Sequence, residues 1–267
     1  MKMSMGQITT LPKTMEQDVV SYEKAGFQLV ELAFPTVNRY LEEHTPEEMR
    51  KLLDSHGLRA VSAIGMAPTD VGIIYARGEE AEIYFRSLES QLRLCSVMGC
   101  EFINLGSDDD KFHYDGYEEQ AIANLRRAGD LAARYQMKVA LEDGKMDRCM
   151  KLVYGADHPN VFFCIDFFWY IKHGYQVDQF KSFDMSRLLN IHFCDLPEGY
   201  QVETMDDSVR VLPGEGVLPL KEWLRWLEED QGFHGYCCLE LLNEELWQME
   251  SDQACLRCME AMKTFFN

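Results

Sequence analysis

The chain has 267 residues, of which 46% are hydrophobic and 27% charged, a composition typical of a soluble globular protein with a substantial core. Its formal net charge of −19 and sequence pI near 4.7 disfavour nucleic-acid binding, because a strongly acidic protein repels phosphate backbones. No apolar run is long enough for a signal peptide or a membrane span, so we expect a cytoplasmic protein without membrane contact.

Nine cysteines are scattered through hydrophobic segments, which favours reduced, buried thiols over a disulfide framework. Cys255 and Cys258 form a CxxC pair. A structural zinc site of this type needs a second pair, and the sequence contains no matching one. We therefore interpret these two residues as thiols on a C-terminal helix.

A repeated unit runs along the chain, in which a short apolar run is followed by a longer amphipathic stretch. This pattern is typical of βα repeats with a parallel sheet. No linker or shift in composition supports a domain boundary. The apolar runs predicted as strands are residues 1–8, 27–34, 58–65, 100–106, 137–143, 161–166, 188–195 and 236–243.

Helix signals lie between these strands. Thr45 precedes Pro46, which places an N-cap residue before a proline at the first helical position, and Gly57 follows at the other end. Other predicted helices are residues 79–99, 117–136 and 220–232. Eight strands alternating with helices predict an α/β fold, a single-domain (β/α)8 TIM barrel over residues 1–267, with a doubly wound open sheet as the alternative.

In four consecutive predicted strands, the apolar segments KVALE, FFCID, LNIH and CCLE end in a residue type that binds metal ions, and these residues are Glu142, Asp166, His192 and Glu240. The C-terminal ends of barrel strands open on one face, where barrel enzymes place their active sites. Three carboxylates and one imidazole suit one divalent metal ion as cofactor. Mn²⁺ is favoured, and Mg²⁺, Co²⁺ or Zn²⁺ also suit this ligand set.

Each of these residues also has a purely structural interpretation. An acidic residue that closes a strand, such as Asp166, is often a helix N-cap, and His192 on an apolar strand resembles a core histidine. Glu142 and Glu240 need a compensating partner if they are buried. Their placement at consecutive strand ends favours one shared metal site.

The chain resembles the xylose isomerase-like barrel superfamily, also called the sugar phosphate isomerase/epimerase group, on motifs spread through most of its length. These motifs are AGFQLVELAF, GLRAVSAIG, MGCEFINLGS, MKVALED with Glu142, VFFCIDFFW with Asp166, NIHFCD with His192 and Asp195, RVLPGEG, and GYCCLELL with Glu240. The ordered set is more specific than any single motif, since PGEG alone can be an ordinary turn.

The resemblance to ketose 3-epimerases of this superfamily implies that a metal ion binds adjacent oxygens of a ketose. Glu142 and Glu240 would be both ligands and the acid/base pair, one on each face of the carbon that loses its proton, and the cation would stabilise the enediolate. It also implies that Arg210 and Glu215 approach the substrate. Asp195 would orient the site from behind the ligands or from a loop.

Two positions depart from the family pattern. Trp169 stands where many relatives have a histidine that contacts the substrate, and it offers a stacking surface and an N–H donor but no proton exchange. DGKMDR follows Glu142 in place of the usual continuation, so Asp143 or Lys145 would supply the contact expected there. Glu31 and the acidic run 107–110 are expected on the same rim, the run as a solvated loop.

The leading hypothesis is a metal-dependent isomerase or epimerase whose partner is a small-molecule sugar, ketose or polyol-derived substrate. The scarcity of basic clusters favours a substrate without phosphate. The alternatives are an inosose dehydratase-like lyase and, because of Trp169, a non-catalytic binding barrel. The abasic-site endonuclease branch is disfavoured, since it needs more histidines and the acidic charge repels DNA. Barrels of this group frequently associate, so a homo-oligomer is among the expected states.

Overall fold

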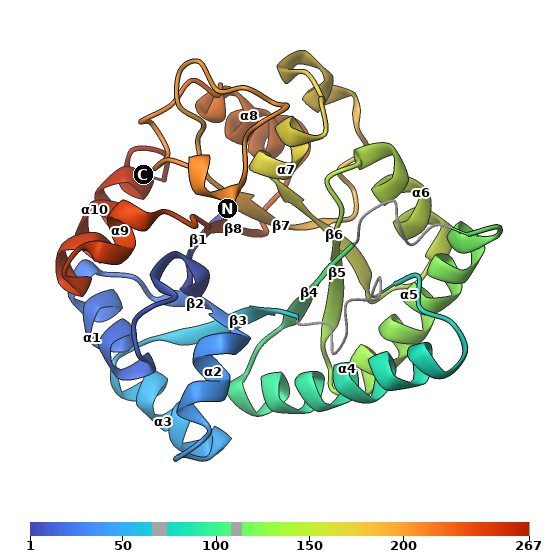
Figure 1. The fold of residues 1–267 in the computed structure, drawn as a ribbon, viewed down its shortest axis with the longest axis horizontal. Helices are drawn as coiled ribbons and strands as arrows, with labels where there is room; N and C mark the ends of the chain where they lie inside the picture. Colours follow the sequence, from blue (N-terminus) through green and yellow to red (C-terminus); the bar gives the residue numbers. More distant parts are fainter. Residues whose placement is uncertain (66–73, 108–113, 267) are drawn as a thin grey trace.

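The computed structural model describes residues 1–65, 74–107 and 114–266, and it confirms a closed barrel of eight parallel strands (Figure 1). Each strand pairs with its neighbour in chain order, and β8 closes the barrel on β1, where Met5 lies opposite Leu239. The C-terminal ends of all strands therefore open on one side. The strands are β1 Lys2–Gly6, β2 Leu29–Ala33, β3 Arg59–Ile64, β4 Phe102–Gly106, β5 Lys138–Glu142, β6 Val161–Asp166, β7 Leu188–Phe193 and β8 Tyr236–Leu239.

Helices form a ring around the barrel (Figure 1). The predicted start of the helix after Thr45 is confirmed, since Thr45 and Glu48 cap each other's backbone N–H groups in a capping box. The helix predicted from residue 220 is α8, which continues into a π-helical turn, η5. The helices are α1 Met15–Ala25, α2 Phe34–Tyr40, α3 Pro46–Ser55, α4 Gly78–Met98, α5 Tyr117–Arg134, α6 Met146–Ala156, α7 Phe167–Lys172, α8 Leu220–Arg225, α9 Glu244–Gln248 and α10 Ser251–Lys263, with the short turns η1 Gln7–Thr10, η3 Val177–Ser182, η4 Asp207–Val209 and η5 Trp226–Asp230.

Apolar side chains pack on both faces of the strands, as expected for a parallel barrel. A small cluster is separate from the main core and consists of Val61, Phe102, Ala140, Cys164 and Tyr236. Phe102 shares its strand face with Asn104, and Tyr236 shares its face with Cys238 and Glu240. This cluster therefore fills the barrel interior on the N-terminal side of the polar strand-end residues, and it supports them from below.

All nine cysteines are free and buried, as the sequence predicts. Cys255 and Cys258 lie on α10, which packs against α1. In this position they fill the interface between two outer helices, because a buried thiol packs like a small apolar side chain.

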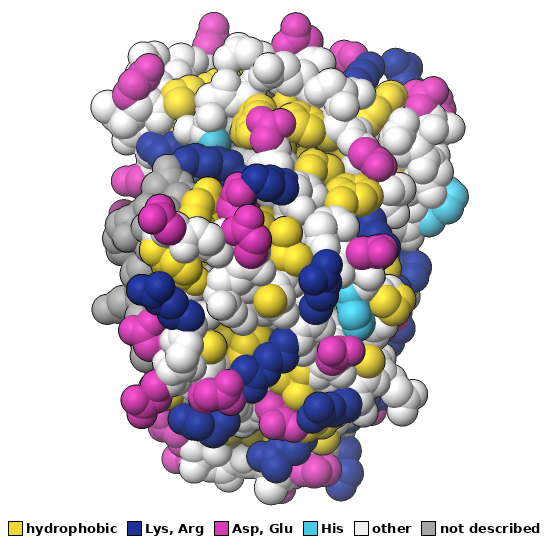
Figure 2. Space-filling view, turned by 90° about the vertical axis from the view of Figure 1, so that its right-hand side faces the viewer, with side chains coloured by type: hydrophobic (Ala, Val, Ile, Leu, Met, Phe, Trp, Pro, Cys, Tyr) yellow, Lys and Arg dark blue, Asp and Glu magenta, His cyan; other side chains and the backbone are white. Residues whose placement is uncertain are grey.

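Charged side chains of both signs alternate over the side of the molecule drawn in Figure 2, without gathering into large patches of one sign. Exposed ion pairs such as Arg127 with Glu82 join neighbouring helices, here α5 and α4. Each such pair contributes only about 0.2–1 kcal/mol to stability. Within the described ranges, no helix combines the length and apolarity needed to cross a membrane.

Asp18 of α1 is a buried carboxylate outside the strand-end cluster. Its Oδ2 accepts a hydrogen bond from Gln7 Nε2 at 3.0 Å. Burial raises the pKa of Asp18 to about 7, although hydrogen bonds from Thr10 and Gln7 oppose the shift. The folded state then binds this proton more tightly than the unfolded chain does. The contribution of Asp18 to stability is therefore most favourable below the unfolded pKa of about 4, and it is lost as the pH rises through about 7.

We expect Asp18→Asn to remove this pH dependence. Relative to the variant, the wild type should lose about 2–3 kcal/mol of unfolding free energy between pH 5 and pH 8, since each unit of pKa shift corresponds to about 1.4 kcal/mol. Urea denaturation at both pH values measures the difference. Asp178→Asn, at an exposed position, serves as the control. Parallel pH profiles for Asp18→Asn and the wild type would contradict the prediction.

Candidate metal centre

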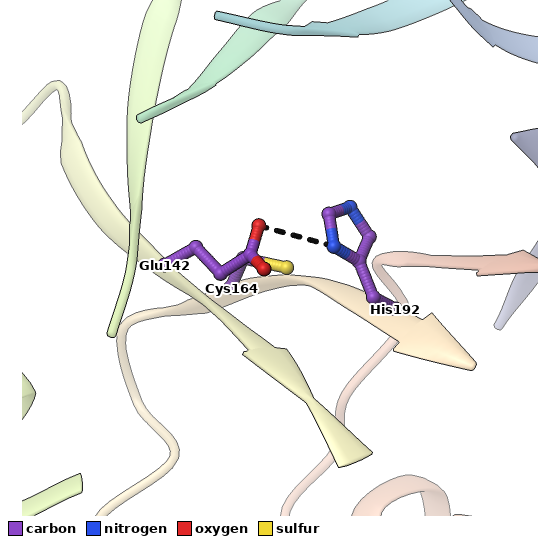
Figure 3. Close-up of side chains that lie close together, drawn as sticks. All are labelled: Glu142, Cys164 and His192. Atoms are coloured by element: carbon purple, nitrogen blue, oxygen red, sulfur yellow. Dashed lines mark ion pairs between the residues drawn. The ribbon is translucent and has the colours of Figure 1, made fainter. Parts of the chain in front are cut away.

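The structure brings the four predicted ligands together. Glu142 ends β5, Asp166 ends β6, His192 lies on β7 and Glu240 directly follows β8. One potential ligand atom from each lies within 4.8 Å of the others. His192 Nδ1 is 3.1 Å from Glu142 Oε2, an ion pair drawn in Figure 3, and 3.0 Å from Glu240 Oε2. The carboxylates of Glu142 and Glu240 therefore converge on one ring nitrogen.

The hydrogen bonding of this cluster is incomplete in a way that fits a cation. Among the described residues, neither His192 Nδ1 nor Asp166 Oδ2 makes a hydrogen bond of acceptable geometry, although both are buried. Both atoms lie in ion pairs, His192 Nδ1 with Glu142 and Glu240 and Asp166 Oδ2 with Arg210, but buried polar atoms without a well-formed hydrogen bond are rare and costly. A divalent ion between the four residues would satisfy the imidazole lone pair and the carboxylates together. The donor set thus fits a metal ion with mixed oxygen and nitrogen ligands.

The charges around His192 also favour a cation. Burial alone lowers the pKa of His192, but the Cys164 thiol, shown beside it in Figure 3, and the carboxylates of Glu240, Glu142 and Glu31 raise that pKa well above its ordinary value. A metal ion must displace the proton that the imidazole would otherwise bind. Metal binding at this centre should therefore release a proton and weaken as the pH falls.

Asp166 acts both as a helix cap and as part of the cluster. Its Oδ1 accepts the backbone N–H groups of Phe168 and Trp169 at 2.7 and 3.4 Å, so it is the N-cap of α7. Its Oδ2 lies 2.8 Å from Arg210 Nη1. Burial raises the pKa of Asp166 to about 6, with Arg210 opposing the shift and Glu240 adding to it. The two interpretations of this residue are therefore compatible.

Arg210 lies behind the carboxylates. Its Nη1 is 2.8 Å from Asp166 Oδ2 and 3.3 Å from Glu240 Oε2, and its Nη2 is 2.6 Å from Asp207 Oδ1. The side chain is only 1% exposed and stacks over the ring of Phe168 at 4.4 Å. Arg210 thus compensates charge within the cluster instead of reaching into the open space above it.

Glu215, also predicted to approach the substrate, is not brought to this centre. Its carboxylate accepts hydrogen bonds from Arg257 of α10 at 3.0 and 3.2 Å and is 45% exposed. The reason is the path of the loop, which turns at Gly214, where φ is 92°, and the opposite charge that α10 presents on the outside of the barrel. Glu215 therefore helps to attach the loop to α10.

The side chain of Asp195 holds the PGEG loop by binding the backbone N–H groups of the loop. Its carboxylate accepts N–H groups from Leu196, Gly214, Gly216 and Leu218 at 2.9–3.2 Å. A Cβ on Gly216 would lie 2.2 Å from the Leu196 carbonyl oxygen and 2.4 Å from Asp195 Oδ1, so only glycine fits there. Asp195 thus positions the loop that follows Arg210 and lies outside the ligand cluster.

The prediction that Glu31 lies on the rim of the barrel is wrong. This residue is fully buried in the barrel interior, where its Oε1 lies 2.8 Å from His192 Nε2. Glu31 is the middle residue of β2, so its side chain enters the barrel below the strand ends that form the rim. An acidic residue in the middle of an apolar strand was the feature of the sequence that could have indicated this buried position.

A cavity of about 310 Å³ opens above the cluster. Glu142 and Glu240 line it, whereas Asp166 and His192 do not. The latter two are sealed below, each with a side chain that is 0% exposed. Two of the four candidate ligands can therefore contact a molecule bound in the cavity, and the other two can only contact the metal.

Part of the cavity lining comes from the residues that follow β5 and from α7. Asp143, Lys145 and Trp169, the positions where the sequence departs from the family pattern, all line it. Sequence reasoning missed His173, which also lines the cavity and stacks on Trp169 with ring centroids 5.9 Å apart. A Cβ on Gly144 would lie 2.2 Å from the His173 ring, so this glycine permits the close approach.

The acidic run after β4 is only partly within the structure. Ser107 lines the cavity. Residues 108–110 lie outside the described residues, and their expected place in a solvated loop stays a prediction.

Comparisons with known proteins agree with the barrel fold. An inosose isomerase of Halalkalibacterium halodurans is 22% identical over 95% of this chain and 92% of its own. A crystal structure of the IolI protein with a zinc atom matches 100% of both chains with a TM-score of 0.88 at 18% identity. A D-allulose 3-epimerase from Methylomonas sp., solved with D-allulose, covers 100% of this chain and 97% of its own, with a TM-score of 0.76 at 14% identity. The model of the xylose isomerase-like TIM barrel family matches residues 21–262, and the chain therefore belongs to that family.

Proposed function

We propose that this protein is a divalent-metal-dependent isomerase or epimerase of a small polyhydroxy ketone, with Glu142 and Glu240 as the acid/base pair. The observation that carries the proposal is the division of the cluster, in which only these two of the four candidate ligands line the cavity. The names of the relatives support the substrate class, since they include an inosose isomerase and a D-allulose 3-epimerase.

The chemistry requires removal of a proton from the carbon beside a carbonyl group. A divalent ion bound here would stabilise the negative charge that develops on the substrate oxygen. Glu142 and Glu240 face the cavity, so one carboxylate takes the proton and the other returns one. Return to the opposite face of the same carbon is epimerisation, and return to the neighbouring carbon is isomerisation.

Other residues of the chain restrict how a substrate lies between the two glutamates. The Trp169 ring offers an apolar surface to the C–H groups of a sugar or polyol. Arg210 contacts the Glu240 carboxylate at 3.3 Å and limits its rotation. Below them, Asp166 and His192 fix the position at which the metal would bind. The residues for proton transfer and for metal binding are therefore held by the same barrel strands.

Product analysis in D₂O tests the proposal. The metal-depleted protein, reconstituted with Mn²⁺ or Zn²⁺, is incubated with inososes and ketoses. We expect deuterium at the carbon beside the carbonyl and no loss of water, and we expect a chelator to stop the exchange because the negative charge is then unstabilised. Loss of water would identify a dehydratase. Metal binding without any exchange across these substrates would identify a non-catalytic barrel, and either result would overturn the proposal.

A further inference from the structure

Beneath the metal centre, the barrel interior contains polar side chains for which the proposed proton transfer has no use. Glu31, Ser62, Asn104 and Asn190 come from β2, β3, β4 and β7, and each is at most 1% exposed. A fully buried carboxylate is costly unless hydrogen bonds and charge compensate it. This group of four residues, here called the interior polar layer, therefore needs an explanation beyond packing.

Every polar neighbour of the Glu31 carboxylate donates a hydrogen bond to it. Its Oε2 accepts from Ser62 Oγ at 2.6 Å, from Asn104 Nδ2 at 2.6 Å and from Asn190 Nδ2 at 3.1 Å. Its Oε1 is 2.8 Å from His192 Nε2 and accepts a hydrogen bond from the Cys238 thiol at 3.4 Å. Asn104 Nδ2 lies 3.2 Å from the same nitrogen, but its shorter contact, of 2.6 Å, is the hydrogen bond to Glu31 Oε2. An ionised carboxylate can only accept, so His192 Nε2, at 2.8 Å from Oε1, bears a hydrogen and donates it to Glu31.

We propose that Glu31 is a positioning residue for the metal centre, which fixes His192 with Nε2–H directed at Glu31 and Nδ1 directed at the metal. The inference rests on the metal site of the proposed function. Neutral imidazole exists as two tautomers, and only the one with hydrogen on Nε2 leaves a lone pair on Nδ1. That nitrogen already faces Glu142 and Glu240 at 3.1 and 3.0 Å.

The interior polar layer explains how Glu31 can perform this role. Three donors from three strands immobilise Oε2, which leaves Oε1 aimed at the histidine. A carboxylate bonded to the far nitrogen of a metal-binding histidine orients the ring and increases its basicity. The layer thus holds a negative charge at a fixed distance below the metal position, on rigid strands instead of loops.

Glu31→Gln tests the role of this charge, since it preserves the side-chain volume. The amide oxygens of Asn104 and Asn190 make no hydrogen bonds among the described residues, so both amides can turn to accept from the new NH₂ group. Calorimetric titration of the metal-depleted protein with Zn²⁺ measures the effect. We expect the Kd to rise by about 10- to 100-fold in Glu31→Gln, because the orienting carboxylate is lost.

Asp18→Asn is the matched control, because Asp18 is also a buried carboxylate but lies outside the metal centre on α1. Its Kd for Zn²⁺ should equal that of the wild type. Equal Kd values for Glu31→Gln and the wild type would overturn the inference and leave the metal site intact. Failure of the wild type to bind Zn²⁺ would instead overturn the metal site of the proposed function.

A second measurement needs no variant. Nitrogen NMR of the imidazole rings in the zinc-loaded wild type reports which nitrogen of His192 carries hydrogen. We expect a slowly exchanging hydrogen on Nε2 and none on Nδ1, because Nε2 donates to Glu31 inside the barrel. Hydrogen on Nδ1, with zinc on Nε2, would overturn the inference whatever the behaviour of Glu31→Gln.

Discussion

Replacing Glu142 or Glu240 with glutamine should lower turnover by about 10²- to 10⁴-fold, the usual contribution of general acid–base catalysis. An amide fills the same space as the carboxylate but cannot accept the substrate proton. Each single variant should still exchange deuterium with one of the two epimers, because the remaining glutamate still faces its side of the cavity. If a variant no longer converts one epimer into the other but still exchanges deuterium with one of them, each glutamate acts on a separate face of the substrate carbon.

The measurement is kcat of each variant under saturating metal, with bound metal determined on the same sample so that loss of metal is not mistaken for loss of proton transfer. Glu215→Gln is the control, because Glu215 lies on the outside of the barrel beside Arg257 and should leave turnover unchanged. Full activity in both Glu142→Gln and Glu240→Gln would exclude them as the acid/base pair.

Arg210→Met should destabilise the metal-free protein by about 3–5 kcal/mol, the cost of removing one partner from a buried ion pair. The guanidinium is 1% exposed and contacts the carboxylates of Asp166 and Glu240. Methionine matches the length of the aliphatic stem but leaves these carboxylates uncompensated inside the protein. Urea denaturation of the metal-depleted protein measures the loss.

Saturating metal should restore part of this stability, because the cation neutralises the same carboxylates that Arg210 compensates. Arg257→Met is the matched control, since Arg257 is 35% exposed and pairs with surface glutamates. Its effect should stay within about 1 kcal/mol. Equal stabilities of Arg210→Met and Arg257→Met would contradict the assignment of Arg210 as the compensating charge of the centre.

The closed barrel and the convergence of the four ligand candidates could both be predicted from the sequence. Parallel strands buried on both faces form continuous apolar runs, and the residues that close these runs must meet at one end of the barrel. Glu142, Asp166, His192 and Glu240 were therefore visible as strand-terminal residues. Their convergence needs no knowledge of the loops.

The sequence did not reveal the surroundings of four other residues, Glu31, Arg210, Glu215 and His173. Glu31 lies in the middle of β2, and its burial depends on the hydrogen-bond donors that β3, β4 and β7 supply inside the barrel, which spacing along one strand does not show. Arg210 and Glu215 lie in a loop shaped by the Asp195 carboxylate and a glycine turn, and no periodicity describes such a segment. His173 reaches the cavity only because Gly144 lacks a side chain, a contact between segments that sequence spacing does not show.

The hydrogen bonds between β1 and β8 join the first and last strands of the barrel, with Met5 opposite Leu239. Until β8 has formed, β1 and β7 each present an unpaired edge of backbone N–H and C=O groups, which can pair with other chains. Contacts of such long sequence separation form slowly, because chain entropy is lost before pairing stabilises the product. Glu240 directly follows β8, so we expect the metal centre to be completed only when the barrel closes, late in folding.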